Sequence, residues 1–240
     1  MTLRDITFPT PEENILFDEV LFTLAEDGQM GESLRFWESE ITFIVLGKIG
    51  DPLEDLKAKT VREDNMPVLR RCSGGGTVVQ GQGCLNYTLI LSKVRPEIAT
   101  IHKSYQFILG KTIEVLREVQ IEAEYKPISD LALIRGEKKF SGNAQRRGKK
   151  FILHHGTLLY NFDLSLIERY LTIPKSIPEY RRNRGHEEFV TNIPLPVPTF
   201  KKLLAQSFGV CDENYDAHPA EQQKLESFLR TRKVVIDFLV

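Results

Sequence analysis

Two long segments of the chain place hydrophobic residues at the spacing of an amphipathic helix. The first covers residues 14–26 and the second residues 98–119. Their apolar positions recur every three or four residues, as on one face of a helix: Ile15, Leu16, Val20, Leu21 and Leu24 in the first, and Ile101, Tyr105, Ile108, Leu109, Ile113 and Leu116 in the second. Pro9 and Pro11 precede the first segment and suit a helix start. We therefore expect two long helices here.

Shorter runs of apolar and β-branched residues predict strands. They cover residues 34–37, 42–46, 68–71, 85–91, 131–134, 139–141 and 151–159. The turn residues 135–138 separate two of these runs, which indicates a β-hairpin. A polar stretch at 51–64 predicts a loop with a short helix.

Beyond residue 160 the pattern predicts shorter helices and one long loop. We expect helices at 163–171, 200–208 and 219–229, with Asp163 as a cap and Pro219 in a first turn. The proline-rich stretch 175–198 reads as mostly loop. Because the hairpins adjoin one another and the helices cluster, the pattern favours an α+β fold with a mixed, mostly antiparallel sheet over strict βαβ alternation. We expect one catalytic domain over residues 1–240, with C-terminal helices at about 200–240.

Composition excludes several classes of protein. The 240 residues carry a formal net charge of −1, so no overall field draws this chain to nucleic acid or to a membrane surface, and we expect neither as a partner. The longest apolar runs have the length of strands, and no signal peptide is evident at the N-terminus. Three cysteines, Cys72, Cys84 and Cys211, form no disulfide framework and no CxxC zinc pair. We expect a reducing compartment, the cytoplasm or an organelle matrix.

A glycine run supplies the first candidate for chemistry. Residues 70–79 read Arg-Arg-Cys-Ser-Gly-Gly-Gly-Thr-Val-Val. Three consecutive glycines let backbone N–H groups converge on an anion, and Arg71 is a bidentate donor for phosphate or carboxylate. A flexible turn is an equally good reading of the glycines alone. The run is neither a P-loop nor a dinucleotide fingerprint.

Two further segments add a lysine and a histidine pair. Residues 138–147 read Lys-Lys-Phe-Ser-Gly-Asn-Ala-Gln-Arg-Arg, where a lysine ammonium among small residues suits an acyl phosphate; composition alone favours a solvated basic hairpin. His154 and His155 are adjacent on a predicted strand, so they point to opposite faces and do not share a metal ion. One of them is expected to line a pocket.

Taken in order, these segments resemble the lipoate–protein ligase A family. The resemblance also includes Gly83-Cys84-Leu85-Asn86-Tyr87, Asp130-Leu131-Ala132, His154-His155-Gly156-Thr157 and Val190-Thr191-Asn192. It covers roughly residues 14–171 and implies the α+β fold of biotin and lipoate protein ligases. It implies a catalytic role for Lys139, which would contact the phosphate and the acyl carbonyl. It also implies a set of binding residues: Arg71, Ser73, Gly74, Gly75, Gly76, Thr77, Val78, Val79, Asn86, Asp130 and His155.

The resemblance implies a two-step reaction. Lipoate or octanoate reacts with ATP and Mg²⁺ to give acyl-AMP, and the ε-amine of a carrier lysine then displaces AMP. The implied carriers are lipoyl domains of 2-oxoacid dehydrogenases or the glycine cleavage H protein. Basic residues at 146–150 and 181–184 have two readings, a docking surface for an acidic carrier and a solvated face, and charge clustering alone leaves both open.

Departures from the family pattern leave alternatives open. Residues 47–51 read Gly-Lys-Ile-Gly-Asp where many ligases have Gly-Arg/Lys-x-Gln-Asn. We expect the small accessory domain that usually follows to be absent from these 240 residues, so a separate accessory subunit is one alternative. Another is an octanoyl or lipoyl transferase that uses a cysteine thioester, although its nucleophile position holds no cysteine here. A non-catalytic carrier-binding paralogue and a biotin ligase fit less well, since Arg71 and Lys139 are retained and the biotin signature is absent.

Overall fold

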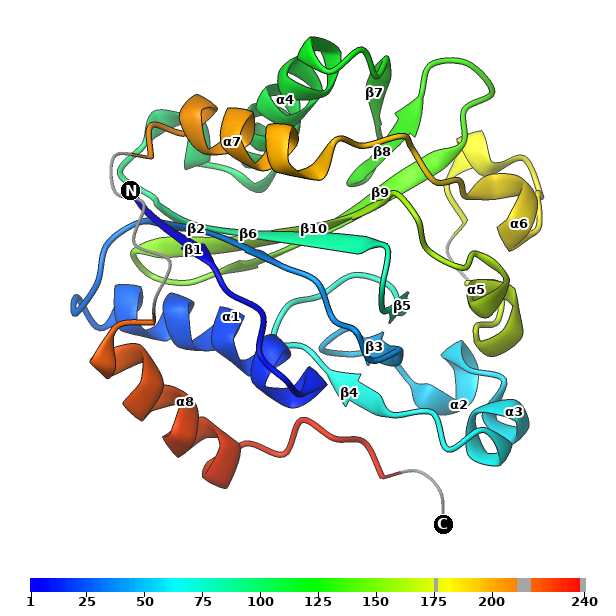
Figure 1. The fold of residues 1–240 in the computed structure, drawn as a ribbon, viewed down its shortest axis with the longest axis horizontal. Helices are drawn as coiled ribbons and strands as arrows, with labels where there is room; N and C mark the ends of the chain where they lie inside the picture. Colours follow the sequence, from blue (N-terminus) through cyan, green and yellow to red (C-terminus); the bar gives the residue numbers. More distant parts are fainter. Residues whose placement is uncertain (175–176, 211–216, 238–240) are drawn as a thin grey trace.

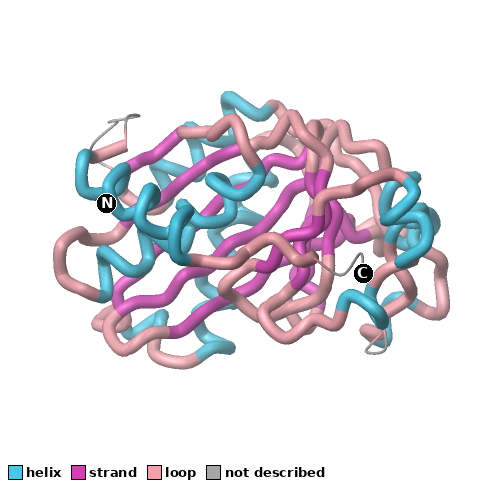
Figure 2. The backbone as a smooth tube through the Cα atoms, turned by 90° about the horizontal axis from the view of Figure 1, so that it is seen from below, coloured by secondary structure: helices cyan, strands magenta, loops and turns pink. Residues whose placement is uncertain are grey.

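A seven-stranded mixed sheet forms the centre of the molecule (Figure 1). The computed structural model describes residues 1–174, 177–210 and 217–237. Only β1 and β2 pair in parallel; the other neighbours in this sheet are antiparallel. The strand order is β1 (Thr2–Asp5), β2 (Ser33–Trp37), β6 (Cys84–Ser92), β10 (Phe151–Leu159), β9 (Lys139–Arg147), β8 (Asp130–Leu133) and β7 (Ala123–Lys126). Figure 2 shows these strands side by side, with helices around them.

A second, three-stranded sheet lies below the first in Figure 1. Its order is β4 (Val68–Arg70), β3 (Phe43–Leu46) and β5 (Val78–Gln80). The C-terminal tail runs along the outer edge of β4, where the Ile236 N–H donates to the Val68 carbonyl at 2.8 Å. The connection from β4 to β5 contains the three consecutive glycines.

Helices cover both faces of the large sheet. On one face α1 (Pro11–Glu26) packs against α8 (Pro219–Thr231), and on the other face lie α4 (Ile101–Glu118) and α7 (Val197–Ser207) (Figure 1). Strand β10 alternates between the two cores: Ile152 and Leu158 face α4, while Leu153 faces α1. The same alternation places each functional side chain of β9 and β10 on a defined face.

Short helices occupy the connections. They are α2 (Pro52–Asp55), α3 (Ala58–Glu63), η1 (Pro96–Ile98), α5 (Ser165–Tyr170), η2 (Glu179–Arg181) and α6 (His186–Phe189). The expected cap at Asp163 is wrong in position: Leu164 is the N-cap and has no side-chain cap bond, although Asp163 Oδ1 accepts from the Ser165 N–H at 3.1 Å. Within the described part of the chain, no helix has the length and apolar character needed to cross a membrane.

Candidate active site

The glycine loop of residues 71–77 is packed tightly between β3 and β9. Gly75 has φ +87°, and a Cβ there would lie 2.9 Å from Arg71 Nη2 and 3.4 Å from the Ala144 Cβ. A Cβ on Gly47, at the end of β3, would collide with the Gly75 carbonyl. The loop therefore needs glycine both for its backbone conformation and for close approach to its neighbours.

Arg71 holds the glycine loop from within. Its Nη2 donates to the carbonyls of Gly74 and Gly76 at 2.7 and 2.8 Å, and its Nε donates to Ser73 Oγ at 3.1 Å. Burial lowers the pKa of Arg71 to about 10. Its guanidinium shapes the loop in this structure, so contact with a phosphate requires it to exchange loop carbonyls for phosphate oxygens.

Lys139 lies on the same face of the sheet as the glycine loop. Its ammonium is 2.8 Å from Asp130 Oδ1, and it lies over Gly142, where a Cβ would be 3.2 Å from Nζ. Tyr180 donates its hydroxyl to the other carboxylate oxygen of Asp130 at 2.7 Å. A lysine held in this way presents a positive charge to a ligand above Gly142, which has no side chain to block it.

The two histidines point to opposite faces, as strand alternation predicts. His154 is fully buried on the α4 side, where Tyr87 and Tyr105 pack near its ring. Burial lowers the pKa of His154 to about 3, so this imidazole is neutral. His155 faces the glycine loop, with Nε2 2.6 Å from Ser73 Oγ. The structure thus brings His155, and not His154, to the candidate site.

The remaining predicted binding residues support the far end of the loop. Thr77 donates its hydroxyl to Asp55 Oδ2 at 2.6 Å. Asn86 donates to Gln80 Oε1 at 3.0 Å and accepts from Thr157 Oγ1 at 2.6 Å. Val78 and Val79 belong to β5, and Val79 is buried in a hydrophobic cluster.

Sequence reasoning missed the residues behind the site. Arg35 is fully buried on β2, and its Nη1 lies 2.7 Å from Oδ1 of Asp18 on α1. Burial raises the pKa of Asp18, but Arg35, His155 and Thr88 outweigh it and hold the pKa below the ordinary value. Trp37, also on β2, has a buried indole N–H without a hydrogen-bond partner among the described residues. Only tertiary packing reveals these roles.

The described cysteines lack the properties of a nucleophile. Burial raises the pKa of the Cys72 thiol to about 11 and raises that of Cys84 further. Cys84 has no exposed surface. Because the thiolate is the reactive form, neither thiol is activated in this structure. Cys211 lies outside the described residues.

The basic residues considered as a carrier-docking surface do not lie together. Arg146 pairs with Glu19 at 2.8 Å, and Arg147 donates to the Ile98 carbonyl at 2.6 Å. Arg184 instead donates to the Gly136 carbonyl, at the opposite end of β9. The ends of this nine-residue strand are about 27 Å apart at the usual rise per residue. The two groups of basic residues therefore lie at opposite ends of β9, and docking of an acidic carrier on either of them stays a prediction.

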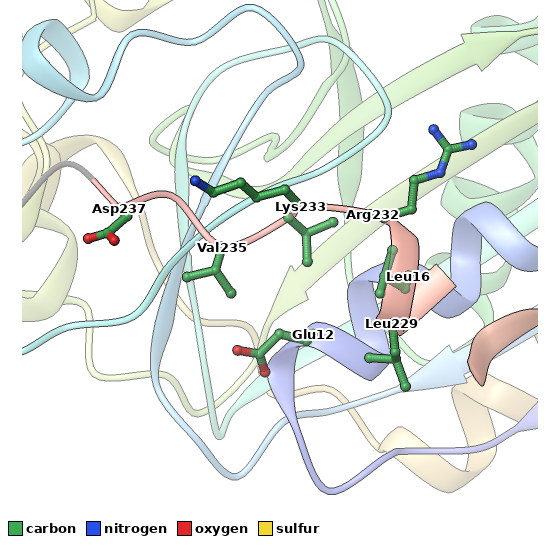
Figure 3. Close-up of a pocket in the computed structure, with 8 residues that line it drawn as sticks. Glu12, Leu16, Leu229, Arg232, Lys233, Val235 and Asp237 are labelled. Atoms are coloured by element: carbon green, nitrogen blue, oxygen red, sulfur yellow. The ribbon is translucent and has the colours of Figure 1, made fainter. Parts of the chain in front are cut away.

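One surface pocket lies away from these residues. It has a volume of about 360 Å³ and is formed by α1, α8 and the C-terminal tail (Figure 3). Its lining includes Leu16, Leu229 and Val235 but no residue of the glycine loop and neither Lys139 nor Asp130. Within residues 1–174, 177–210 and 217–237, no three His, Cys, Asp or Glu side chains gather as metal ligands.

Comparisons with known proteins agree with this fold and these motifs. The family model of the lipoyl protein ligase A/B catalytic domain matches residues 10–209. A probable lipoate-protein ligase A of Mycoplasma pneumoniae is 29% identical over 203 residues, which cover 82% of this chain and 58% of that protein. The chain spans between 50% and 58% of the length of the first curated relatives it matches.

Solved structures share the fold over almost the whole chain. The bi-partite lipoate protein ligase of Thermoplasma acidophilum, studied with its E2 lipoyl domain, has a TM-score of 0.79 at 19% identity, covering 96% of this chain and 92% of that one. A lipoate-protein ligase A bound with ATP has a TM-score of 0.80 at 19% identity, covering 96% and 94%. The fold and the family match together place this chain in the lipoyl protein ligase A/B catalytic domain family.

Proposed function

We propose that this protein activates lipoate or octanoate with ATP and attaches the acyl group to a lysine of a lipoyl carrier domain. The observation that carries the proposal is the Lys139 ammonium, held by Asp130 above Gly142 on the face that bears the glycine loop. A positive charge and a glycine loop on one face suit an acyl phosphate, in which charge develops on phosphate and carbonyl oxygens. The names of the relatives support the same chemistry.

Each proposed site residue has a distinct task. Lys139 neutralises the phosphate and polarises the acyl carbonyl, while Asp130 and Tyr180 fix the position of its ammonium. The backbone of Gly74, Gly75 and Gly76 approaches the adenylate, and Arg71 keeps that backbone in shape. Mg²⁺ would enter with ATP and shield its phosphates, since this ion is often bound by one or two carboxylates plus substrate phosphates. Asp130 is the carboxylate beside Lys139.

The proposed partners are lipoyl domains of 2-oxoacid dehydrogenases or the H protein of glycine cleavage. One alternative is a two-component ligase that needs a separate accessory subunit, and another is a transferase that carries the acyl group on a cysteine. The raised thiol pKa values of Cys72 and Cys84 support the ATP-dependent route. The choice between lipoate and octanoate depends on the length of the acyl chain that the folded protein can accommodate.

The test incubates the protein with ATP, Mg²⁺ and either acid, and looks for acyl-AMP by mass spectrometry. We expect acyl-AMP with ATP and none without it, followed by a mass increase on an apo-lipoyl domain. Cys84→Ser serves as a matched variant: it should keep adenylation, and no acyl label should stay on the denatured protein. A hydroxylamine-sensitive acyl group on Cys84, with ATP-independent transfer from an acyl carrier protein, would establish the transferase instead. Activity that appears only with an added accessory protein would identify a two-component ligase.

A further inference from the structure

A continuous chain of hydrogen bonds runs from the glycine loop into the protein behind it. Ser73 Oγ is 2.6 Å from His155 Nε2, and His155 Nδ1 is 3.3 Å from Asp18 Oδ2. At the other end, Arg71 Nε lies 3.1 Å from Ser73 Oγ. A serine, a histidine and an aspartate in this order form the arrangement with which proteins move a proton between a hydroxyl and an imidazole.

The donors and acceptors in this series of hydrogen bonds determine which atoms of Ser73 and His155 carry protons. The Asp18 carboxylate can only accept, so the Nδ1 atom of His155 carries a proton toward it. In the unprotonated imidazole the Nε2 atom is then the acceptor for the Ser73 hydroxyl, while Arg71 Nε donates to the same serine oxygen. Arg35 holds Asp18 Oδ1 at 2.7 Å, and Thr88 donates to Oδ2 at 2.8 Å. The carboxylate is fixed in place and charged.

The hydrogen-bonded series Ser73–His155–Asp18, called the relay below, lies on the same face of the sheet as Lys139. Gly75 approaches the Ala144 side chain, so Ala144 points to the glycine loop, and His155 pairs directly opposite Ala144. Gly142, two residues before Ala144, shares that face and lies beneath the Lys139 ammonium. Gly142 pairs with Thr157, which makes His155 its diagonal neighbour at about 7–8 Å. His155 and the Lys139 ammonium therefore lie over neighbouring positions of one sheet face.

Amide formation needs a base at that position. The carrier amine becomes an ammonium as it bonds to the carbonyl, and its extra proton must be removed. Asp130 is occupied on both oxygens, by Lys139 and by Tyr180. Glu19, near Cys72, is paired with Arg146. His155 has 16% of its side chain exposed, and its partner Ser73 belongs to the glycine loop.

We propose that His155, acting through the Ser73 hydroxyl, is the general base for transfer of the acyl group to the carrier lysine. The inference rests on the proposed function. The neutral amine forms a C–N bond with the acyl carbonyl, the C–O bond to phosphate breaks, and AMP leaves with the electron pair. The amine proton passes to Ser73 Oγ while the serine proton passes to His155 Nε2. Asp18 stabilises the imidazolium, which later releases its proton to solvent.

The charged groups around His155 set the conditions of this step. Asp18 and Glu19 approach from α1, Arg71 from the glycine loop and Arg146 from β9, with Arg35 behind Asp18. A base works only in its unprotonated form, so the rate of acyl transfer rises with pH as the imidazole loses its proton. The adenylation step needs no such base and lacks this dependence.

The experiment separates the two steps in the full chain. Transfer is measured in single turnovers from chemically prepared lipoyl-AMP to an apo-lipoyl domain, and adenylation by lipoate-dependent ATP–pyrophosphate exchange. His155→Gln keeps a polar partner for Ser73 but accepts no proton. We expect it to slow transfer by about 10²-fold or more and to remove the rise with pH, while pyrophosphate exchange falls by a much smaller factor, because His155 also holds Ser73 of the glycine loop.

Two further variants serve as a control and as a test that Ser73 and His155 act together. His102→Gln removes an exposed histidine of α4 and should change neither step. Ser73→Ala together with His155→Gln should slow transfer no more than the slower single variant, since both interrupt one relay. Equal losses in exchange and transfer, or an unchanged pH profile in His155→Gln, would overturn the proposal. Because lipoyl-AMP is supplied, a protein that transfers but does not adenylate would contradict the proposed function and leave the relay supported.

Discussion

Lys138 and Lys139 are adjacent in sequence but differ in their surroundings. The Lys139 ammonium meets Asp130 at 2.8 Å, whereas the Lys138 carbonyl accepts from Leu133 in the hairpin turn. We predict that Lys139→Ala lowers acyl-AMP formation by about two to three orders of magnitude, the scale of losing one charge-stabilising donor. Lys138→Ala is the matched control and should have little effect. Initial rates of pyrophosphate exchange measure both, and similar losses would show that the catalytic lysine has been misassigned.

The sequence identifies residues that belong to continuous motifs and misses those that meet through folding. Lys139, Ser73 and His155 each lie in a recognisable segment. Asp18 and Arg35 do not, because an acidic residue in an amphipathic helix and an arginine in a strand read as ordinary surface positions. Their 2.7 Å contact exists only because α1 packs across β2. A buried ion pair is therefore visible in the structure alone.

At the scale of elements, the glycine loop depends on Gly47, which directly follows strand β3. A side chain on Gly47 would collide with the Gly75 carbonyl. We predict that Gly47→Ala displaces the loop and lowers pyrophosphate exchange by about 10²-fold, as expected for a misplacement on the order of 1 Å. The fold should survive, which circular dichroism and urea unfolding will check.

Gly110→Ala is the control for this substitution. Gly110 lies within α4, and a Cβ there meets nothing within 4 Å. Replacing it should stabilise the helix by about 0.5–1 kcal/mol and leave exchange unchanged. If Gly47→Ala retains full exchange, the close packing of Gly47 against the loop is not required for binding the nucleotide.

The elements found from sequence are those with a strong pattern. The helical periodicity of α1 and α4 and the apolar run of β6 predict the observed segments to within three residues. The β8–β9 hairpin is also found, but β9 continues to Arg147, six residues beyond the predicted end. α4 begins at Ile101, later than predicted, because Thr100 caps it and residues 96–98 form a separate 3₁₀ turn. The short strands β1, β5 and β7 were missed because three or four residues show no clear alternation. These three segments form strands because they pair with neighbouring strands in the sheets.

For the whole molecule, the fold class follows from the sequence and the strand order does not. Adjacent hairpins and family motifs predict an α+β sheet. The order β1-β2-β6-β10-β9-β8-β7 pairs strands that are far apart in the chain, such as β2 with β6 and β6 with β10. These pairings depend on which apolar faces meet when the chain collapses, and local periodicity carries no information on that choice.

The two ends of the described chain are joined by a buried ion pair. Arg4 Nε on β1 lies 3.1 Å from Glu221 Oε2 on α8, with 4% and 1% of the two side chains exposed. Glu221→Gln keeps an acceptor for the His218 N–H at the helix start but removes the carboxylate charge that faces the buried Arg4. We predict a loss of about 3–5 kcal/mol in the free energy of unfolding, the cost of breaking a buried pair from one side. Urea unfolding at pH 7 measures it.

Lys224→Ala provides the control on the same helix. Lys224 pairs with Asp27 at 3.7 Å in a partly exposed position, so its loss should cost no more than about 1 kcal/mol. Pyrophosphate exchange by folded Glu221→Gln should match that of the unsubstituted protein, because the pair contacts neither the glycine loop nor Lys139. Equal unfolding midpoints for the two variants would mean that water reaches Arg4 once Glu221 is changed. In that case the packing of α8 against α1, rather than the ion pair, holds the C-terminal helix on the sheet.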